Sequence, residues 1–367
     1  MKREVTLKRR SFIAASSAAL AAGVAPIVSA QTQPAVTWRL SSSFPKGLDT
    51  IFGGAEQFSK IVETLTGGKF KITIHAPGEI MPALANFKGV QDGTIECAHT
   101  AGYYFLNVNS ALAIDTTLPF GMNQRQHNGW VYQGGGMELL RELFAQYNIV
   151  NFPMGNTGAQ MGGWFNKEIR TLEDIKGLKI RIPGFGGEIW KQLGAAPVSM
   201  PGGEIVAAMT EKKIDAAEWV GPYDDEKLGL AKIARYYFYP AWWEPAATLS
   251  LYVNKKAFDA LPPAYQEAIS AATTVVNQSM MALYDARNPQ AFKTLIGSGT
   301  RLQVFPNSFM IAAYRAANAI FDAESAKNPA FKKIYVPWKK YRANITEWHK
   351  TAENSMTNFL SNWKAEG

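Results

Sequence analysis

The chain has 367 residues, a formal net charge of +8, one cysteine and four histidines. A single cysteine, Cys97, can build neither a disulfide framework nor a cysteine-based zinc site within one chain, and the histidines stand at none of the spacings that bind a transition metal. The first thirty residues hold five basic residues and one acid, so the other 337 carry +4 with no dense Lys/Arg run, which argues against nucleic-acid binding.

Residues 1–30 have the pattern of a secretory signal. Basic residues come first, an apolar stretch runs from Phe12 to Ala22, and Val28-Ser29-Ala30 is an A-x-A-like cleavage site. The apolar stretch is shorter than the roughly 20 residues of a bilayer span, which argues against a membrane anchor. Arg9-Arg10 followed by Ser11-Phe12-Ile13 is typical of the twin-arginine type. We therefore expect export to the periplasm and a mature chain of about two domains.

The first part of the mature chain alternates between strand and helix patterns. Strands are predicted at Val36 to Leu40, Phe70 to His75 and Thr94 to Thr100, and helices at about Thr50 to Leu65 and Leu84 to Asp92. This order favours an α/β fold with a mostly parallel sheet that helices cover on both faces.

A second lobe is predicted from about Gly155 to Tyr239. Its strands are expected near Gly162 to Asn166, Leu178 to Ile182 and Ala216 to Val220. The alternating segment within Ala246 to Asn254 is expected to lead the chain back to the first lobe. Two lobes that exchange the chain more than once form a hinge around a cleft.

Long helices are predicted for the C-terminal part. One begins at Pro262-Pro263, which suit a helix start, and Pro289 is expected to break or kink it. The chain is again helical from Asn307 and ends in the aromatic-dotted segment Trp348 to Trp363. The predicted organisation is a first lobe of 31–154 plus 245–300, a second lobe of 155–244 plus part of 301–340, and a C-terminal helix at 341–367.

Arg181 is an unusual residue for its position, at the end of the buried strand pattern Leu178 to Ile182 and before Pro183-Gly184. Arginine is seldom buried unless paired, and the carboxyl ends of strands in an open α/β lobe face the crevice where ligands bind. A bidentate contact with a ligand carboxylate explains it, and an ion pair with a neighbouring acid is the alternative. Glu218-Trp219, at the end of another strand, favours the ligand.

Other motifs exclude more than they support. Gly184-Phe-Gly186-Gly187 lacks the third glycine of a dinucleotide fingerprint, and no G-x-S-x-G elbow occurs in the chain. Asp224-Asp225-Glu226 open a predicted helix, where acids complement the helix dipole. In the aromatic run Tyr236 to Pro245, an unpaired Glu244 would be costly, which favours a cleft wall over a core or a lobe interface.

Four motifs together resemble the substrate-binding receptors of tripartite ATP-independent periplasmic (TRAP) transporters. They are Arg181-Ile-Pro-Gly184, Ala195-Ala-Pro-Val198, Pro201-Gly-Gly-Glu204 and Ile214-Asp-Ala-Ala-Glu-Trp219. The similarity covers essentially the whole mature chain. Within it, Trp219 to Gly229 and Tyr237 to Glu244 are similar to the branch that binds α-keto acids such as pyruvate, or 2-hydroxy acids such as lactate.

The resemblance implies a two-lobed α/β periplasmic binding protein that closes on an organic acid and delivers it to a membrane permease without performing chemistry. It implies that Arg181 pairs with the ligand carboxylate and that a cation, sodium or alternatively calcium, bridges protein and ligand. The matching positions around the cation and the ligand are Gln160, Glu218, the backbone of Trp219, and Glu244. Oxygen ligands suit a hard cation, and such a site prefers an acid with a second oxygen beside its carboxylate.

Two alternatives stay open at this point. The resemblance implies a homodimer through the C-terminal helix, for which Trp348, Phe359 and Trp363 would suit, although packing of this helix on its own lobe explains them equally well. The rival to a receptor is an exported lyase or hydrolase that uses Glu218 and Glu244 as acid and base. The lack of a catalytic motif argues against that enzyme.

Overall fold

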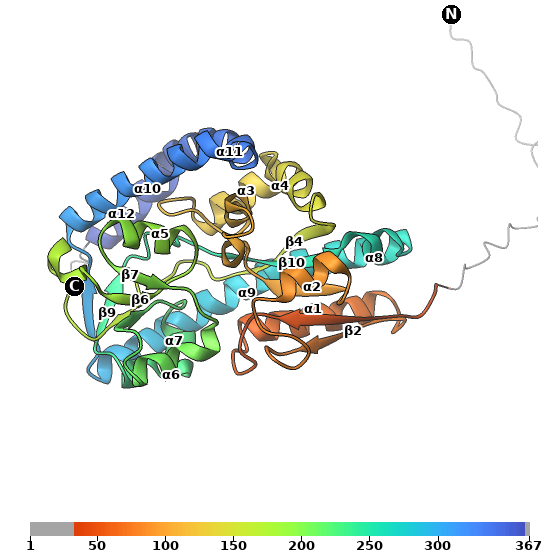
Figure 1. The fold of residues 1–367 in the computed structure, drawn as a ribbon, viewed down its shortest axis with the longest axis horizontal. Helices are drawn as coiled ribbons and strands as arrows, with labels where there is room; N and C mark the ends of the chain where they lie inside the picture. Colours follow the sequence, from red (N-terminus) through yellow and green to blue (C-terminus); the bar gives the residue numbers. More distant parts are fainter. Residues whose placement is uncertain (1–32, 364–367) are drawn as a thin grey trace, which may run out of the picture. The chain divides into compact units, whose positions relative to one another are not determined.

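The structure is a computed structural model that describes residues 33–363, so the predicted signal segment lies outside the described residues. Two separate β-sheets, each accompanied by helices, make up the described part of the chain (Figure 1). No helix among residues 33–363 is both long and apolar enough to cross a bilayer.

The first sheet has five strands in the order β2-β1-β3-β10-β4. Their bounds are Val36–Ser42 (β1), Phe70–His75 (β2), Cys97–Thr100 (β3), Ile149–Asn156 (β4) and Thr248–Asn254 (β10). Strand β1 is parallel to β2 and β3, as predicted, but β10 is antiparallel to both β3 and β4. The sheet is therefore mixed rather than mostly parallel, because the chain returns through β10 from the opposite direction.

The second sheet has six short strands in the order β11-β9-β5-β8-β6-β7. Their bounds are Trp164–Phe165 (β5), Lys179–Arg181 (β6), Ala196–Val198 (β7), Ala216–Ala217 (β8), Tyr236–Tyr239 (β9) and Arg301–Val304 (β11). The strand predicted to reach Val220 ends at Ala217 because the following residues take other partners. The Arg181 guanidinium donates to the Glu218 carbonyl, and the Met161 amide donates to the Val220 carbonyl.

Alternating residues of these short strands enter two different hydrophobic cores. Phe165 of β5 and Ala216 of β8 belong to one core, whereas their neighbours Trp164 and Ala217 belong to the other. This is the two-residue period of a strand whose two faces are both covered. Each core contains residues from both sheets, so both hydrophobic cores connect the two sheets.

Helices cover the sheets and link them. Their bounds are Ile51–Leu65 (α1), Asn86–Asp92 (α2), Gln124–Gln133 (α3), Gly136–Ala145 (α4), Gly184–Gln192 (α5), Ile205–Thr210 (α6), Pro222–Leu228 (α7), Lys255–Asp259 (α8) and Pro263–Gly297 (α9). Helix α9 contacts α1 and β4 and also α7, so it joins elements associated with both sheets (Figure 1).

Helix α9 continues through Pro289, so of the predicted break or kink the break does not occur there. Proline removes one backbone hydrogen bond from a helix interior. Tyr284 and Ala291 are buried on either side of it, and Asn288 accepts a hydrogen bond from the Tyr223 amide of α7 at 3.1 Å. These tertiary contacts hold the helix across the proline.

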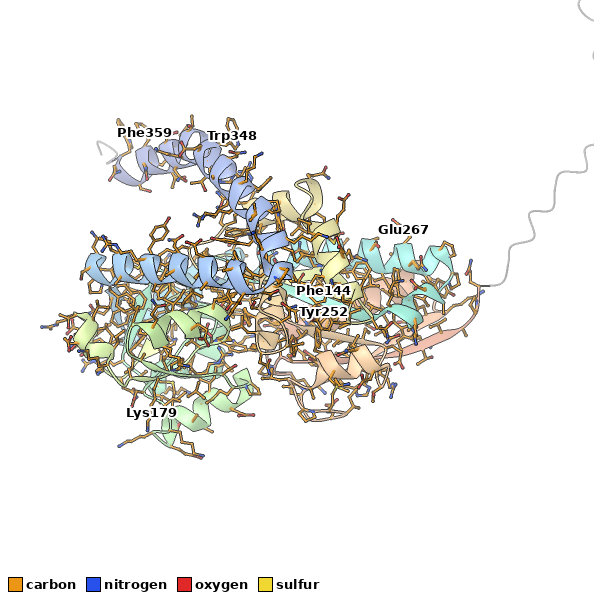
Figure 2. The ribbon with its side chains drawn as sticks, turned by 45° about the horizontal axis from the view of Figure 1, so that its top comes forward. Phe144, Lys179, Tyr252, Glu267, Trp348 and Phe359 are labelled. Carbon is orange, nitrogen blue, oxygen red and sulfur yellow. The ribbon has the colours of Figure 1, made fainter. Side chains whose placement is uncertain are left out.

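The C-terminal helices are α10 (Asn307–Lys327), α11 (Pro329–His349), a π-helical turn (Lys350–Asn354) and α12 (Ser355–Asn362). Helix α10 contacts α5, whereas α11 contacts α3 and α4, and position 341 falls inside α11. Every residue from Asn354 to Trp363 is exposed. Figure 2 shows Trp348 and Phe359 on the segment that projects from the rest of the described chain.

Candidate binding site

Arg181 and Glu218 form an ion pair at the carboxyl ends of two adjacent parallel strands. Arg181 ends β6, and its register partner Ala217 ends β8 directly before Glu218. The Arg181 guanidinium Nη1 donates to the Glu218 carboxylate and, at 3.0 Å, to the Glu218 backbone carbonyl. Both side chains are 1% exposed. The ion pair that the sequence left as an alternative for Arg181 is therefore present.

Further contacts hold the Arg181 guanidinium in one orientation. Its Nε donates to the Met200 carbonyl at 3.2 Å, and its Nη2 lies 3.5 Å from the Tyr104 hydroxyl. The Trp219 ring lies beside it, 5.4 Å from Cζ to the ring centroid. Because the Nη2 contact is at the outer limit of a hydrogen bond, this nitrogen keeps donor capacity for a ligand.

Glu244 and Gln160 are also buried, at 3% and 8% exposure, and the charge of Arg181 acts on Glu244. Burial raises the pKa of Glu244 to about 7. Hydrogen bonds from Tyr103 and Gln160 and the positive charge of Arg181 lower this pKa and only partly offset the effect of burial. Glu244 follows Trp243, which packs against Trp190 and Phe305 of the core. The aromatic run therefore supplies both core residues and one wall of the site.

Two carboxyl groups share this buried volume. Burial raises the pKa of Glu218 well above its ordinary value; Arg181 lowers it and Glu244 raises it. Burial alone would lower the pKa of Arg181, but Glu218 raises it above the ordinary value, so the guanidinium stays charged. One fixed positive charge thus faces two carboxyl groups that repel each other when both are ionised.

Three buried oxygens in the site accept no hydrogen bond from any residue that the structure describes. They are Gln160 Oε1, Glu218 Oε2 and Glu244 Oε1. Buried polar atoms normally have a partner, and a carboxylate–amide oxygen set is what a hard cation such as sodium or calcium binds. Within residues 33–363 no group of three His, Cys, Asp or Glu side chains forms a metal site. The three unpartnered oxygens, two from carboxyl groups and one from an amide, fit a cation held by a mixed set of ligands.

Trp219 lies where the sequence placed it, next to Glu218 and against Arg181, and it is 5% exposed. A Cβ atom on Gly202 would stand 2.1 Å from the indole, so only glycine allows the ring this position. All five residues predicted to contact the ligand or the cation are buried: Gln160, Arg181, Glu218, Trp219 and Glu244.

Asp224 and Asp225 are structural, as the sequence indicated. Both lie in the first turn of α7. Asp224 accepts hydrogen bonds from Thr50 and Tyr284, at 2.7 and 2.6 Å, and Asp225 accepts them from Trp164 and Tyr237, at 2.9 and 2.6 Å.

Tyr103 and Tyr104 complete the site, and the sequence analysis did not identify them. They lie in the 3-10 turn Gly102–Phe105, just after β3. Their position after a predicted parallel strand could have identified them. Residues at the carboxyl end of such a strand face the ligand crevice, as Arg181 and Glu218 do in the second sheet. Two tyrosines at 4.8 Å between ring centroids add hydroxyl donors to an otherwise acidic surrounding.

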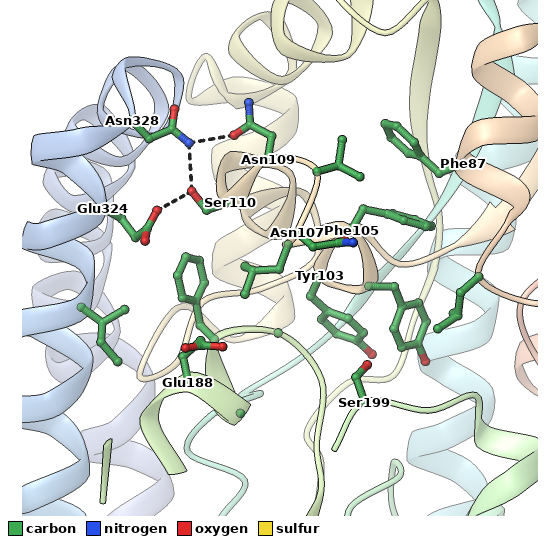
Figure 3. Close-up of a pocket in the computed structure, with 18 of the residues that line it drawn as sticks. Phe87, Tyr103, Phe105, Asn107, Asn109, Ser110, Glu188, Ser199, Glu324 and Asn328 are labelled. Atoms are coloured by element: carbon green, nitrogen blue, oxygen red, sulfur yellow. Dashed lines mark hydrogen bonds between the residues drawn. The ribbon is translucent and has the colours of Figure 1, made fainter. Parts of the chain in front are cut away.

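A pocket of about 1340 Å³ adjoins these tyrosines (Figure 3). Tyr103, Tyr104 and Ser199 line it together with Gly184. On its far wall, Asn328 donates to Asn109 and Ser110 at 2.8 and 2.9 Å, and Ser110 donates to Glu324 at 2.6 Å. The pocket thus runs from helix α10 to the two tyrosines that border the buried charges.

The fold and the site together define an α/β solute-binding protein: two sheets, a chain that passes between them repeatedly, and a buried arginine with acids at the strand ends. The chain belongs to the bacterial extracellular solute-binding protein family 7 (DctP), whose profile matches residues 41–328. Members are substrate-binding receptors of TRAP transporters. The two-lobed fold expected from the sequence is confirmed, and the rival assignment as an enzyme is not supported.

Three relatives are informative. A protein of Nostoc sp., named a monocarboxylate 2-oxoacid-binding periplasmic protein, is 46% identical over 98% of this chain and 99% of its own. A TRAP solute-binding protein of Bordetella bronchiseptica is 47% identical (TM-score 0.88; 89% and 98% of the two chains); its structure is a mixed-occupancy dimer with calcium and picolinate bound. One from Pseudoalteromonas atlantica holds sodium and pyruvate (36%, TM-score 0.86, 90% and 99%).

Proposed function

We propose that this protein captures a small 2-oxo or 2-hydroxy monocarboxylate, such as pyruvate, another α-keto acid or lactate, together with a bound cation. It then delivers the acid to the membrane permease of a TRAP transporter. The observation that carries the proposal is the buried Arg181 next to Glu218 and Glu244. One carboxyl oxygen of each acid, Glu218 Oε2 and Glu244 Oε1, has no hydrogen-bond partner among the described residues.

Arg181 binds the ligand carboxylate in this proposal. Its Nη1 and Nε are held by Glu218 and Met200, and its Nη2 faces the Tyr104 hydroxyl. An arginine already fixed by protein contacts loses little side-chain entropy when the acid arrives. Gln160, Trp219 and Glu244 border the same ligand.

The cation is held by oxygens of Gln160, Glu218, Glu244 and the backbone of Trp219. Two carboxylates and an anionic ligand repel one another strongly in a low dielectric. The positive charge of a bound cation offsets this repulsion. We infer sodium, with calcium as the alternative, because these are the ions in the two relatives' structures. Both ions accept such oxygen ligands.

The bound cation also accounts for the chemical class of the ligand. Pyruvate has a keto oxygen beside its carboxylate, and picolinate has a ring nitrogen at the same place. Each presents two donor atoms to one ion, which a simple carboxylic acid does not. We therefore expect acids with a donor atom on the carbon next to the carboxylate to bind, and their unsubstituted counterparts to bind weakly.

The two sheets mark two lobes, for which we propose the ranges 31–154 plus 245–300 and 155–244 plus part of 301–340, followed by a C-terminal helix at 341–367. In this division, the chain crosses between lobes after β4 and before β10, close to Gln160 and Glu244. Ligand residues therefore stand at the hinge itself, where closure of the lobes assembles the site.

Residues 1–30 direct the protein to the periplasm in this proposal, through a twin-arginine signal that is removed. We also propose a homodimer through the C-terminal helix. Met356, Phe359, Leu360 and Trp363 of this segment are each at least 56% exposed. Exposed apolar side chains grouped on one segment favour an interface, and a second copy of the chain, as in the Bordetella dimer, is the partner that we infer.

Binding without turnover tests the proposal. The mature protein is titrated with pyruvate, lactate, picolinate and propionate in thermal-shift and calorimetric assays, with sodium and calcium each present or absent. An acid at 100 times its Kd should stabilise the fold by about 2.7 kcal/mol. Stoichiometric binding of the first three, but not of propionate, supports the receptor. Equal binding of propionate, or conversion of an acid to product, contradicts it.

A further inference from the structure

Thr157 is a buried residue whose hydroxyl accepts a hydrogen bond from Gln160. It directly follows β4 and is 1% exposed. Its backbone amide donates to the Ala247 carbonyl at 3.1 Å, and its hydroxyl accepts from the Ala247 amide at 3.1 Å. These two bonds tie the chain segment after β4 to the segment before β10.

The other hydrogen bonds of the Thr157 hydroxyl mean that it can only accept a hydrogen bond from Gln160. A hydroxyl has one hydrogen and two lone pairs. The hydrogen points to the Gly158 carbonyl at 3.1 Å, one lone pair accepts from the Ala247 amide, and the other accepts from Gln160 Nε2 at 3.0 Å. Gln160 must therefore turn its NH₂ group, and not its oxygen, toward Thr157.

The rest of the Gln160 amide follows from this orientation. With the NH₂ group so engaged, Gln160 Oε1 remains buried and unpartnered among residues 33–363. It is the atom of Gln160 that a cation would bind.

We propose that Thr157 is a positioning residue, which determines the cation affinity of the site by holding the Gln160 amide with its oxygen toward the ion. This inference rests on the proposed function, since it requires that a cation binds with the acid. Thr157 itself touches neither the ion nor the acid. Hydrogen-bonding partners behind a metal ligand commonly change metal affinity by 10- to 100-fold when removed.

The primary test compares two substitutions at this position. Thr157→Val keeps the shape but removes the hydroxyl, and Thr157→Ser keeps the hydroxyl. Calcium is titrated into each protein by calorimetry in sodium-free buffer with saturating pyruvate, and the melting temperature without calcium or acid is recorded. We expect calcium affinity to fall at least tenfold in Thr157→Val and to return to within about threefold of the parent in Thr157→Ser.

Thr66 offers a matched control. Its hydroxyl also donates to a backbone carbonyl, that of Val62 at 2.8 Å, and accepts from a backbone amide, that of Phe70 at 3.1 Å. It lies at the end of α1, outside the site. Thr66→Val should lower the melting temperature without changing calcium affinity. An equal loss of calcium affinity in Thr66→Val and Thr157→Val would mean that general destabilisation is the cause, which overturns the proposal.

A double-mutant cycle separates positioning from a structural role through Ala247. If Thr157 acts through Gln160, the calcium affinity of Gln160→Ala should not fall further when Thr157→Val is added. Additive losses would overturn the proposal. If Thr157→Val does not fold, Thr157→Ala, which leaves room for water at the Ala247 amide, takes its place in the cycle.

The outcomes also distinguish this proposal from the function on which it rests. If the parent binds pyruvate and calcium and Thr157→Val binds both as tightly as the parent, only the positioning role fails. If the parent binds pyruvate equally well with and without calcium or sodium, the cation site fails and the positioning role fails with it.

Discussion

The guanidinium of Arg181 donates to both the carboxylate and the backbone carbonyl of Glu218, and both side chains are almost completely buried. Arg181 is thus part of a buried ion pair before any acid arrives, and Glu218 is a neighbour of both the acid and the cation in the proposed site. The substitution of either residue will affect stability as well as binding, and variants must separate the two effects.

Arg181→Met should abolish pyruvate binding and lower the free energy of unfolding. Removal of one partner of a buried ion pair costs about 3–5 kcal/mol, because the other charge stays buried without compensation. Addition of Glu218→Gln removes that charge and should restore most of the stability but none of the binding. Chemical denaturation and calorimetry measure the two quantities.

Pyruvate binding by Arg181→Met within a few-fold of the parent would contradict the role of Arg181. Arg181→Lys, which lacks the bidentate fork, should also bind poorly.

Removal of cations should weaken pyruvate binding. After dialysis into calcium-free and sodium-free buffer we expect the affinity to fall by tenfold or more, and to return with one of the two ions. Glu218→Gln should weaken ion and acid binding together, because one carboxylate serves both. Glu188→Gln makes the same charge change on an exposed residue of the adjoining pocket and serves as the control. Unchanged affinity in cation-free buffer would contradict the cation site.

Asp224 and Asp225 should lower the stability without ligands as the pH rises from about 4 to 8. Below about pH 6.5 the buried His99 and His127 oppose this contribution, because burial lowers their pKa values to about 3 and about 4. Burial raises the pKa of Asp224 to about 6 and that of Asp225 to about 7, from an ordinary 3.8. The folded protein therefore keeps protons on these two acids that the unfolded chain has already lost in this interval, and their contribution to the free energy of unfolding decreases with pH. Melting temperatures at pH 5 and pH 8 in cation-free buffer measure the effect.

Asp224→Asn is the informative variant for this pH dependence. The partners of Asp224 are the hydroxyls of Thr50 and Tyr284, which can also accept hydrogen bonds, so an amide fits in its place. The variant should flatten the decrease and be relatively more stable at pH 8. An unchanged slope would show that Asp224 keeps an ordinary pKa.

Gly184→Ala should weaken acid binding more than it weakens the fold. Gly184 has φ +64°, and a Cβ atom there would stand 2.8 Å from the Cβ of Tyr103. An alanine therefore displaces Tyr103, which hydrogen-bonds to Glu244. Gly299→Ala introduces similar backbone strain at φ +99°, with no atom within 4 Å of the added carbon, and is the control. Equal effects of both substitutions on pyruvate affinity would contradict the role of Tyr103.

Substitution of the exposed apolar residues of α12 should produce a monomer. Phe359 stacks on Trp363 with 5.5 Å between ring centroids, and both are exposed. Phe359→Ser combined with Leu360→Ser removes most of this surface, whereas Tyr314→Ser removes an exposed aromatic of α10 and is the control. Sedimentation velocity should show a dimer for the parent and the control only. A monomeric parent at micromolar concentration would contradict the dimer.

Local patterns of the sequence were enough to predict the position of Arg181, the return strand at Thr248–Asn254 and the α/β class. Each depends on short-range information: an arginine at the end of an apolar strand, an alternating segment, and the order of strands and helices. The motif resemblance added the ligand class and the set around Glu218 and Glu244.

Tertiary structure decided what depends on residues far apart in the chain. The antiparallel entry of β10, the continuation of α9 through Pro289 and the contribution of Tyr103 follow from packing between segments, which no local pattern encodes. The same holds for Thr157, whose hydroxyl joins Ala247, 90 residues later, to the amide of Gln160. A hydrogen-bond donor or acceptor has a direction only once the fold has placed its partners, so the sequence could propose residues for the site but not the orientation of their atoms.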